Sequence, residues 1–266
     1  WNDTPIIQYI IILFMFLAGT NFVLSYFAFK GRISKILQDE EFKLYFRFTI
    51  VFTLIVVSII YTHSYLNDSI VFDHPLVLGS AEGSIRHALF QVVAIVTTTG
   101  FVTADYTLWS PLLLVFFFGL MFLGGSAGST SGGIKVVRHL VLIKNGFLEF
   151  KRTLHPSAIL PLRYNNKSVS GEIVFNVLGF FILYMLSFIV GSLGFALLGL
   201  DFESSIGVAA SSLGNVGPAL GEFGPSNNFT EMPTAGKLWA AFLMLIGRLE
   251  LFTVLILFTP FFWRNR

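Results

Sequence analysis

The chain has no cysteine and few charged residues, and each scarcity excludes a class of protein. Without cysteine, the chain can form neither disulfide bonds nor metal sites with thiolate ligands. Only 12% of its 266 residues are charged, whereas 55% are hydrophobic and 16% are aromatic. Because soluble domains carry about 25% charged residues, the composition excludes an ordinary soluble protein. It predicts an all-α membrane protein instead.

The chain also lacks an initial methionine, and no basic leader precedes its first apolar segment. That segment is too long for a signal peptide, so we interpret the sequence as a fragment or a processed piece. Five apolar segments are long enough, at about 1.5 Å per residue, to cross a hydrocarbon core of about 30 Å. They are Ile6–Phe29, Leu44–Leu66, Leu112–Leu123 extended by Ile134–Ile143, Ile173–Leu200 and Leu238–Trp263.

Basic residues gather in alternate connecting segments. If each apolar segment crosses the bilayer, fourteen of the 17 lysines and arginines lie on one side, which the positive-inside rule assigns to the cytoplasm. The segments on the other side are acidic, which is consistent either with attraction of cations or with ordinary solvated loops. The fourteen are Lys30, Arg32, Lys35, Lys43, Arg47, Lys135, Arg138, Lys144, Lys151, Arg152, Arg163, Lys167, Arg264 and Arg266.

Two outward segments are too apolar for loops and too short to span a membrane. They are Ser84–Val96 and Glu203–Leu213, and each is followed by a glycine-containing turn, "TTTGF" or "GNVGP". A half-length helix that returns to the same side is a re-entrant hairpin, whose irregular backbone must line water or an ion path. The pattern therefore predicts the order helix, re-entrant loop, helix, repeated twice.

An internal repeat supports this organisation. The segment "LMFLGGSAGST" from Leu120 aligns with "LMLIGRLELFT" from Leu243, and "MFLAGT" from Met15 resembles the first of them. The turn glycines Gly100 and Gly217 lie 117 positions apart. We therefore expect the first helix to close an earlier repeat that begins outside this sequence.

These patterns predict four regions, and their numbering as parts of a second, third and fourth repeat is what a family resemblance, given below with its motifs, implies. Residues 1–36 form the closing transmembrane helix of a second repeat, and residues 151–171 form a cytoplasmic linker. The third repeat covers 37–150, with a helix at 44–66, a pore helix at 84–96, a filter at 97–101 and a broken helix at 111–150. The fourth covers 172–266, with a helix at 172–200, a pore helix at 203–213, a filter at 214–218 and a helix at 237–263.

The two turns carry the chemistry that the pattern favours. Glycine beside threonine or asparagine permits backbone conformations in which successive carbonyl oxygens face one axis, as in a K⁺ filter. The carboxyl ends of the preceding half-helices carry partial negative charge, which favours cations. The alternative interpretation is a pair of tight turns that only connect buried half-helices. The candidate filter residues are Thr98, Thr99, Gly100, Asn215, Val216 and Gly217.

The stretch "GGSAGSTSGG" interrupts a helix at the depth where the aligned helix carries Arg248. A charge near the bilayer centre costs at least about 2.5 kcal/mol and needs a partner, either unpaired backbone carbonyls or a carboxylate from elsewhere in the chain. We expect this stretch to form a gating loop beneath the filter, held by Arg248 when the pore is shut. Close helix packing through small residues is the alternative. The candidate gating residues are Gly124, Gly125, Ser126, Gly128, Ser129, Thr130, Gly132, Gly133 and Arg248.

Other functions find no support in the sequence. The same stretch lacks the Gly-Lys-Ser/Thr order of a phosphate-binding loop, because Ile134 separates Gly133 from Lys135. The histidines lack metal-ligand spacing, and no serine nucleophile or carboxylate pair is recognisable. We therefore expect neither an enzyme nor a nucleic-acid-binding protein, and no cofactor apart from a transported K⁺ ion.

The motifs "TTTGF", "GGSAGSTSGGIK", "SSLGNVGPALGEFGP" and "GRLELFT", in this order, resemble the TrkH branch of the bacterial Trk/Ktr/HKT potassium transporter superfamily. This resemblance implies a pore of four repeats in the bacterial inner membrane, with filter glycines at Gly100 and Gly217. It also implies a homodimer and a cytoplasmic TrkA-like nucleotide-binding regulatory subunit. Two of the four repeats would lie outside this sequence, so a complete pore would need them.

One alternative function remains open. Broken helices also serve ion-coupled secondary transporters, which would carry K⁺ or Na⁺ by symport. The parallel orientation of the two predicted hairpins argues against an inverted-repeat carrier.

Overall fold

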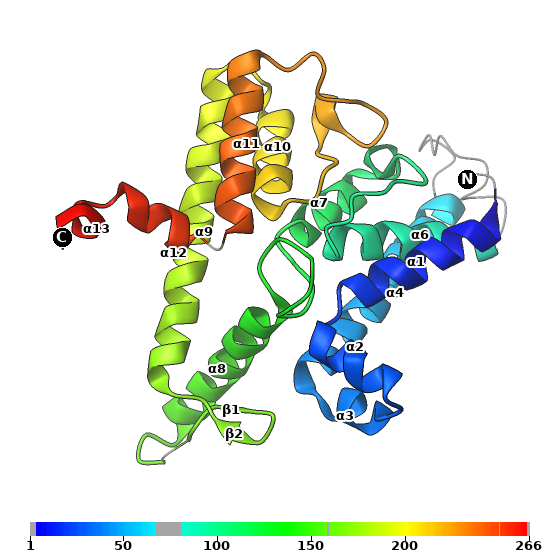
Figure 1. Cartoon of the computed structure of the whole chain (residues 1–266). Coiled ribbons are helices and arrows are strands. Elements are labelled where there is room, and N and C mark those ends of the chain that lie inside the picture. The colour runs from blue at the N-terminus through cyan, green and yellow to red at the C-terminus, as the bar shows by residue number, and fades with distance from the viewer. Residues whose placement is uncertain (1–3, 67–80, 159, 250, 265–266) are drawn as a thin grey trace.

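The computed structural model describes residues 4–66, 81–158, 160–249 and 251–264. Helices make up most of this part, and one small hairpin of two strands is present in it (Figure 1). The α-helices are α1 (Pro5–Ala18), α2 (Phe22–Phe29), α3 (Ile33–Gln38), α4 (Glu40–Leu66), α6 (Ala81–Val96), α7 (Pro111–Leu120), α8 (Val136–Leu154), α9 (Gly171–Leu197), α10 (Phe202–Gly214), α11 (Thr234–Arg248), α12 (Phe252–Leu255) and α13 (Pro260–Arg264). Short 3₁₀ turns cover Tyr106–Leu108, Gly221–Phe223 and Ile256–Phe258, and the strands are β1 (Arg163–Tyr164) and β2 (Lys167–Ser168).

The long helices have the length and composition of membrane spans. In the described residues, Glu40–Tyr61 of α4 and the whole of α9 are apolar enough to cross a bilayer, and two bent helix pairs qualify if each is counted as one span. The 27 residues of α9 extend for about 40 Å at 1.5 Å per residue, more than the hydrocarbon thickness of about 30 Å. Helix α9 leaves large apolar side chains such as Phe175 and Leu197 exposed, which suits contact with lipid rather than water.

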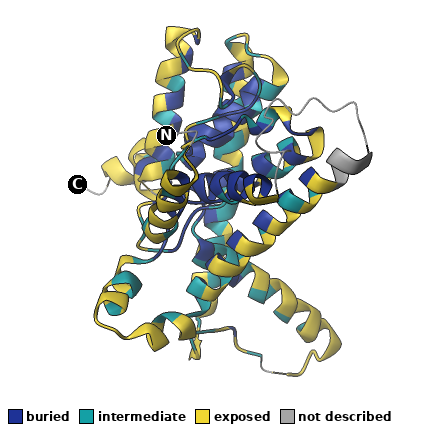
Figure 2. Ribbon diagram, turned by 90° about the vertical axis from the view of Figure 1, so that its right-hand side faces the viewer, coloured by how far each residue is buried: buried dark blue, intermediate teal, exposed yellow. Residues whose placement is uncertain are grey.

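The two short helices α6 and α10 are instead enclosed by protein. Twelve of the 16 residues of α6 and ten of the 13 residues of α10 are buried, so most of each helix is covered by other parts of the chain. Helix α6 packs against α1, α4 and α7, and α10 packs against α9 and α11 (Figure 1). Figure 2 shows the buried residues gathered in the middle of the molecule, with the exposed ones along the outer helices.

Polar side chains on the buried helix α6 have partners within the fold. The Arg86 guanidinium lies 2.8 Å from the Glu82 carboxylate, and His87 Nδ1 lies 2.9 Å from the Thr103 hydroxyl. Gln91 donates to the Ala104 carbonyl at 3.0 Å. Because unpaired polar groups are costly in an apolar interior, these bonds fix the rotation of α6 about its axis.

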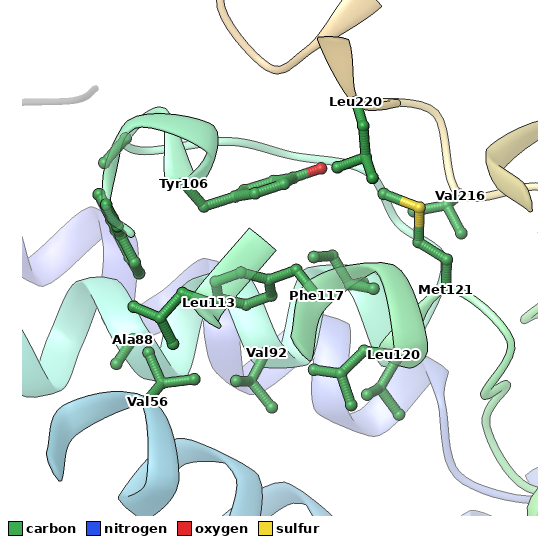
Figure 3. Close-up of a cluster of buried hydrophobic side chains, with 14 of the residues drawn as sticks. Val56, Ala88, Val92, Tyr106, Leu113, Phe117, Leu120, Met121, Val216 and Leu220 are labelled. Atoms are coloured by element: carbon green, nitrogen blue, oxygen red, sulfur yellow. The ribbon is translucent and has the colours of Figure 1, made fainter. Parts of the chain in front are cut away.

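One hydrophobic cluster joins the two halves of the molecule beside the glycine turns. It brings Val56, Val92 and Phe117 from α4, α6 and α7 together with Val216 and Leu220 from the segment after α10 (Figure 3). The Tyr106 hydroxyl extends toward the same segment and donates to the Ala219 carbonyl at 3.3 Å. The core therefore fixes the second turn relative to the first.

Two expected helices are not continuous, and both expectations are wrong in this respect. The helix expected within 1–36 bends by 114° between α1 and α2, and the helix expected over 237–263 ends at Arg248 and bends by 114° before α12. The first bend follows from Gly19, whose missing side chain lets Thr97 approach, and from Asn21, which caps α2. The second places Leu251 and Val254 in a buried cluster that includes Phe180.

The other expected helices overlap helices of the described structure. The pore helices expected at 84–96 and 203–213 fall within α6 and α10, and the helices expected at 44–66 and 172–200 overlap α4 and α9. The broken helix expected at 111–150 is present as α7 and α8. Residues 67–80 of the expected third repeat lie outside the described residues. The division of the chain into repeats stays a prediction.

The N-terminus of α10 offers a test of how the buried helix is stabilised. The Asp201 carboxylate accepts hydrogen bonds from the amides of Glu203 at 3.1 Å and Ser204 at 3.3 Å. We expect Asp201→Ala to lower the free energy of unfolding by about 1 kcal/mol, because the helix loses its N-cap. Thermal unfolding in detergent measures this loss, and Asp201→Asn, which keeps a capping oxygen, should retain most of the stability.

The same residue predicts a pH dependence. Hydrogen bonds from the Ser204 side chain and from nearby amides lower the pKa of the Asp201 carboxyl. The capping contribution is therefore present above the pKa of the unfolded chain and is lost as the pH falls through the lowered pKa. The difference in stability between Asp201→Asn and the parent should change in that acidic range and stay constant at neutral pH. A constant difference through the acidic range would contradict this assignment.

Candidate functional site

The two glycine turns adopt the same unusual backbone pattern. Thr98 has φ +52° and Gly100 has φ +72°, while Asn215 has φ +56° and Gly217 has φ +118°. In each turn, two left-handed residues therefore flank one residue whose φ is negative. The left-handed backbone conformation is costly for residues other than glycine, and among them asparagine tolerates it best. Such a conformation at Thr98 indicates that the surrounding structure imposes it.

The hydrogen bonds that end the two pore helices also correspond. The Thr98 amide donates to the Ile95 carbonyl at 3.0 Å, and the Thr99 amide donates to Ala94 at 2.9 Å. The equivalent bonds run from Asn215 to Ser212 at 3.1 Å and from Val216 to Ser211 at 2.9 Å. All four donors and acceptors are related by the same shift of 117 positions, as Gly100 and Gly217 are. The two turns are copies of one backbone structure.

Most carbonyl oxygens of these turns have no hydrogen-bond donor. Within the described residues, no hydrogen bond reaches the carbonyls of the five residues Thr98, Thr99, Gly100, Asn215 and Val216. The carbonyl of Gly217 differs, because the Ser211 hydroxyl donates to it at 2.9 Å. Buried or half-buried carbonyls normally have partners. A group of free ones at the ends of two buried helices suits water or a cation, and the helix dipoles add to the preference for positive charge.

The two turns lie directly against each other. A Cβ atom at Gly100 would overlap the Val216 carbonyl and would lie 3.1 Å from the Pro218 ring. From the other side, a Cβ at Gly217 would lie 3.6 Å from the Gly100 Cα. The absence of side chains at these positions therefore lets the two backbones meet. The geometry brings all six sequence-predicted filter residues into one site.

The small-residue stretch forms a closed loop between α7 and α8. The Gly124 amide donates to Ile134 at 2.9 Å, and the Ile134 amide donates back to Phe122 at 3.1 Å, which closes the base of the loop. Within it, the Gly125 amide donates to the Ser131 hydroxyl at 2.7 Å. The Lys135 ammonium donates to the Ser131 carbonyl. The loop is therefore fixed by its own hydrogen bonds; Gly124, Gly125, Ser126 and Ser131–Gly133 are buried, whereas Gly128 and Thr130 are exposed.

The loop contacts both turns from below the pore helices. The Gly132 amide donates to the Thr98 hydroxyl at 2.7 Å. A Cβ at Gly132 would overlap the Gly214 carbonyl and would lie 2.9 Å from the Asn215 Cβ. On the α1 side, the Ser126 amide donates to the Gly19 carbonyl at 2.8 Å. The loop residues predicted from the sequence therefore lie against the predicted filter.

Arg248 reaches the same loop from the end of α11. Its guanidinium Nη1 donates to the Thr130 carbonyl at 2.6 Å. Beside this bond is a cavity of about 270 Å³, which is lined by residues that include Ser129, Gly132, Lys135 and Arg248. The partner of Arg248 is a backbone carbonyl, one of the two kinds of group expected from the sequence. The cavity shows that the loop has free space on the Arg248 side.

Several residues of the site were not identified from the sequence. Glu41 is buried and accepts hydrogen bonds from the loop amide of Ala127 at 2.6 Å and from Val137 at 3.2 Å. Ser211 binds both the amide and the carbonyl of Gly217. Neither residue has a local sequence signal. Glu41 binds a loop and a helix that are distant in sequence, and Ser211 binds the turn that follows its own helix. Glu41 stands in the charged stretch "QDEEFK" before the apolar segment Leu44–Leu66, where one more carboxylate does not stand out.

The motifs and the geometry agree with comparisons to known proteins. A model of the family TrkH, described as a cation transport protein, matches residues 1–265. The chain belongs to the TrkH family. Its relatives include the Trk system potassium uptake protein TrkH of Escherichia coli strain K12, 37% identical over 266 residues, 99% of this chain and 52% of that protein. The Trk system potassium uptake protein TrkI of Halomonas elongata is 41% identical over 183 residues, 68% of this chain and 37% of that protein.

A solved structure of the TrkH family shows the same fold. The crystal structure of the potassium transporter TrkH from Vibrio parahaemolyticus matches with a TM-score of 0.87 and 34% identity, over 98% of this chain and 54% of that one. The expected all-α membrane fold is therefore confirmed. The chain spans about half the length of the TrkH relatives it matches.

The contact between the turns predicts the effect of a methyl group at Gly100. We expect Gly100→Ala to destabilise the protein by more than the roughly 1–2 kcal/mol that left-handed backbone costs, since the methyl would also overlap the Val216 carbonyl. Gly31→Ala is the matched control, because Gly31 has φ +70° and no atom within 4 Å of the added Cβ. Thermal unfolding of both variants in detergent measures the difference. Equal losses would show that the two turns are not tightly packed.

Proposed function

We propose that this chain forms half of a potassium-selective pore, with the carbonyl oxygens of the two glycine turns replacing the water around K⁺. The observation that carries the proposal is the pair of identical turns with free carbonyls at Thr98, Thr99, Gly100, Asn215 and Val216. A ring of such oxygens lowers the cost of dehydrating an alkali cation. The named relatives, which are potassium uptake proteins and a potassium transporter, support K⁺ as the ion.

The position of the turns relative to their helices favours a cation over an anion. Helices α6 and α10 both end at the turns, so the partial negative charges of their carboxyl ends lie at the same place. The amides of the turns are used in hydrogen bonds to the preceding helices, which leaves acceptors and few donors. An anion would find no ligands among the five free carbonyls.

The loop from Gly124 to Gly133 is proposed as the gate of this pore. It lies against both turns through Gly132 and is held on one side by Arg248. With Arg248 bound to the Thr130 carbonyl, the loop occupies the space beneath the filter, and its release into the neighbouring cavity would open the path. The gating residues of this proposal are Gly124, Gly125, Ser126, Gly128, Ser129, Thr130, Gly132, Gly133 and Arg248.

The rest of the assembly follows from the family. The other half of the pore would come from two repeats that this sequence does not include, since the relatives are about twice as long. We further propose a homodimer in a bacterial inner membrane, regulated from the cytoplasm by a TrkA-like nucleotide-binding subunit. The basic residues around Lys144–Lys167 are the proposed contacts for that subunit.

Growth in low K⁺ tests the proposed conduction. The complete gene that encodes this chain should restore growth of a bacterium deficient in K⁺ uptake, and Gly100→Ala and Gly217→Ala should each abolish the rescue. Gly31→Ala should keep it, because that glycine is distant from the turns, and immunoblots check that all variants reach the membrane. Rescue that survives both turn variants would refute the filter. Uptake that depends on a second ion gradient would favour symport.

Removal of the Arg248 side chain tests the gate. A hydrogen bond to a charged group is worth about 1.5–3 kcal/mol, so Arg248→Ala should raise K⁺ flux under closed conditions by about tenfold or more. Flux into liposomes that contain the complete protein is the measurement. Arg264→Ala, which removes an exposed arginine at the end of α13, is the control. An unchanged flux in Arg248→Ala would exclude this arginine as part of the gate.

A further inference from the structure

Two helices that begin near the loop are capped by side chains from other parts of the chain. Helix α8 follows the loop directly, and its N-cap residue Lys135 makes no side-chain capping bond. The buried carboxylate of Glu41, from the first turn of α4, instead accepts the Val137 amide at 3.2 Å and the loop amide of Ala127 at 2.6 Å. Free amides at a helix start need acceptors, and a carboxylate is the strongest one available to them. Glu41 thus connects α4 to both the loop and α8.

The start of α4 is held in turn by the hairpin of β1 and β2. The Asn165 carboxamide oxygen accepts the Glu40 amide at 2.9 Å, and its nitrogen donates to the Asp39 carboxylate at 2.8 Å. The Asn165 amide donates to the Glu40 carboxylate at 3.0 Å. The Lys144 ammonium of α8 joins this group, since it lies 2.6 Å from the same carboxylate and 2.8 Å from the Arg163 carbonyl.

These contacts form one continuous path from the hairpin to the loop. The hairpin binds Asp39 and Glu40, and the adjacent Glu41 binds the loop. Adjacent residues in the first turn of a helix move together, because the same helical hydrogen bonds fix their backbone. A displacement of the hairpin therefore displaces the Glu41 carboxylate, which removes the acceptor of the Ala127 amide.

We infer that Glu41 and Asn165 are positioning residues that hold the loop against the filter and couple it to the cytoplasmic hairpin. This inference rests on the proposed role of the loop as a gate. Arg248 holds the loop at Thr130 on one side, and Glu41 holds it at Ala127 on the other. The loop leaves its position only when these bonds break. The hairpin thus provides a route by which an event on the cytoplasmic side reaches the gate.

A thiol reporter tests the position of the loop without measuring ion flux. Ser126 lies in the loop next to Ala127 and is only 1% exposed, so Ser126→Cys places a thiol that a reagent reaches poorly while the loop is held. The reporter is introduced into the complete protein in a cysteine-free background, and the rate of its reaction with a maleimide is measured.

Asn165→Gly removes the carboxamide and keeps the left-handed backbone that this position needs at φ +46°. Asn166→Gly is the matched control, because Asn166 is the neighbouring left-handed residue, with φ +63°, and is exposed. We expect Asn165→Gly and Glu41→Ala to raise the reaction rate of the reporter by about tenfold, which corresponds to the loss of one hydrogen bond to a charged group. Glu41→Gln keeps an acceptor oxygen and should give a smaller increase.

The outcomes separate this inference from the proposed function. A reaction rate in Asn165→Gly that equals the rate in Asn166→Gly would overturn the coupling, whatever the flux. A raised rate together with raised K⁺ flux into liposomes supports both proposals. A raised rate with unchanged flux supports the positioning role and contradicts the role of the loop as a gate. Because Asn165 lies on the hairpin surface, its variant folds even if Glu41→Ala does not.

Discussion

The structure of the site depends on the close approach of backbone to backbone at glycines. Gly100 meets the Val216 carbonyl, Gly132 meets the Gly214 carbonyl, and Gly247 meets the Leu213 carbonyl, each with no room for a side chain. These contacts let two re-entrant turns and one loop share a small volume inside the molecule. The buried helices α6 and α10 end at the turns and so fix the position of the turns in that volume.

The distribution of hydrogen bonds at this centre supports the proposed cation site. The loop amides of Gly124, Gly125, Ser126, Ala127 and Gly132 all donate to acceptors within the fold. Within the described residues, five carbonyl oxygens of the turns accept no hydrogen bond, those of Thr98, Thr99, Gly100, Asn215 and Val216. A buried site whose donors are used and whose acceptors remain favours a cation, because an unpaired carbonyl gains most from a positive charge. The same principle explains the partners of Arg248 and Lys135, which donate to loop carbonyls.

Much of the site could be predicted from the sequence because its signals are local. The length of an apolar run distinguishes a span from a half-helix, and a glycine after threonine or asparagine marks a turn that needs left-handed backbone. These signals placed the pore helices within α6 and α10 and brought Gly100 and Gly217 into correspondence. The charge of Arg248 within an apolar segment predicted a partner, either backbone carbonyls or a carboxylate, and the structure provides the Thr130 carbonyl.

The sequence by itself determined the membrane class, the two glycine turns after short helices and the small-residue loop, because hydropathy, segment length and glycine position act within a few residues of one another. Only the tertiary structure decided the bends after α1 and α11, the hairpin at 163–168, and the roles of Glu41 and Asn165. Hydropathy gives the length of an apolar segment and not its direction. The caps of α8 and α4 come from residues 96 and 125 positions away in the chain, and no local pattern records these pairings.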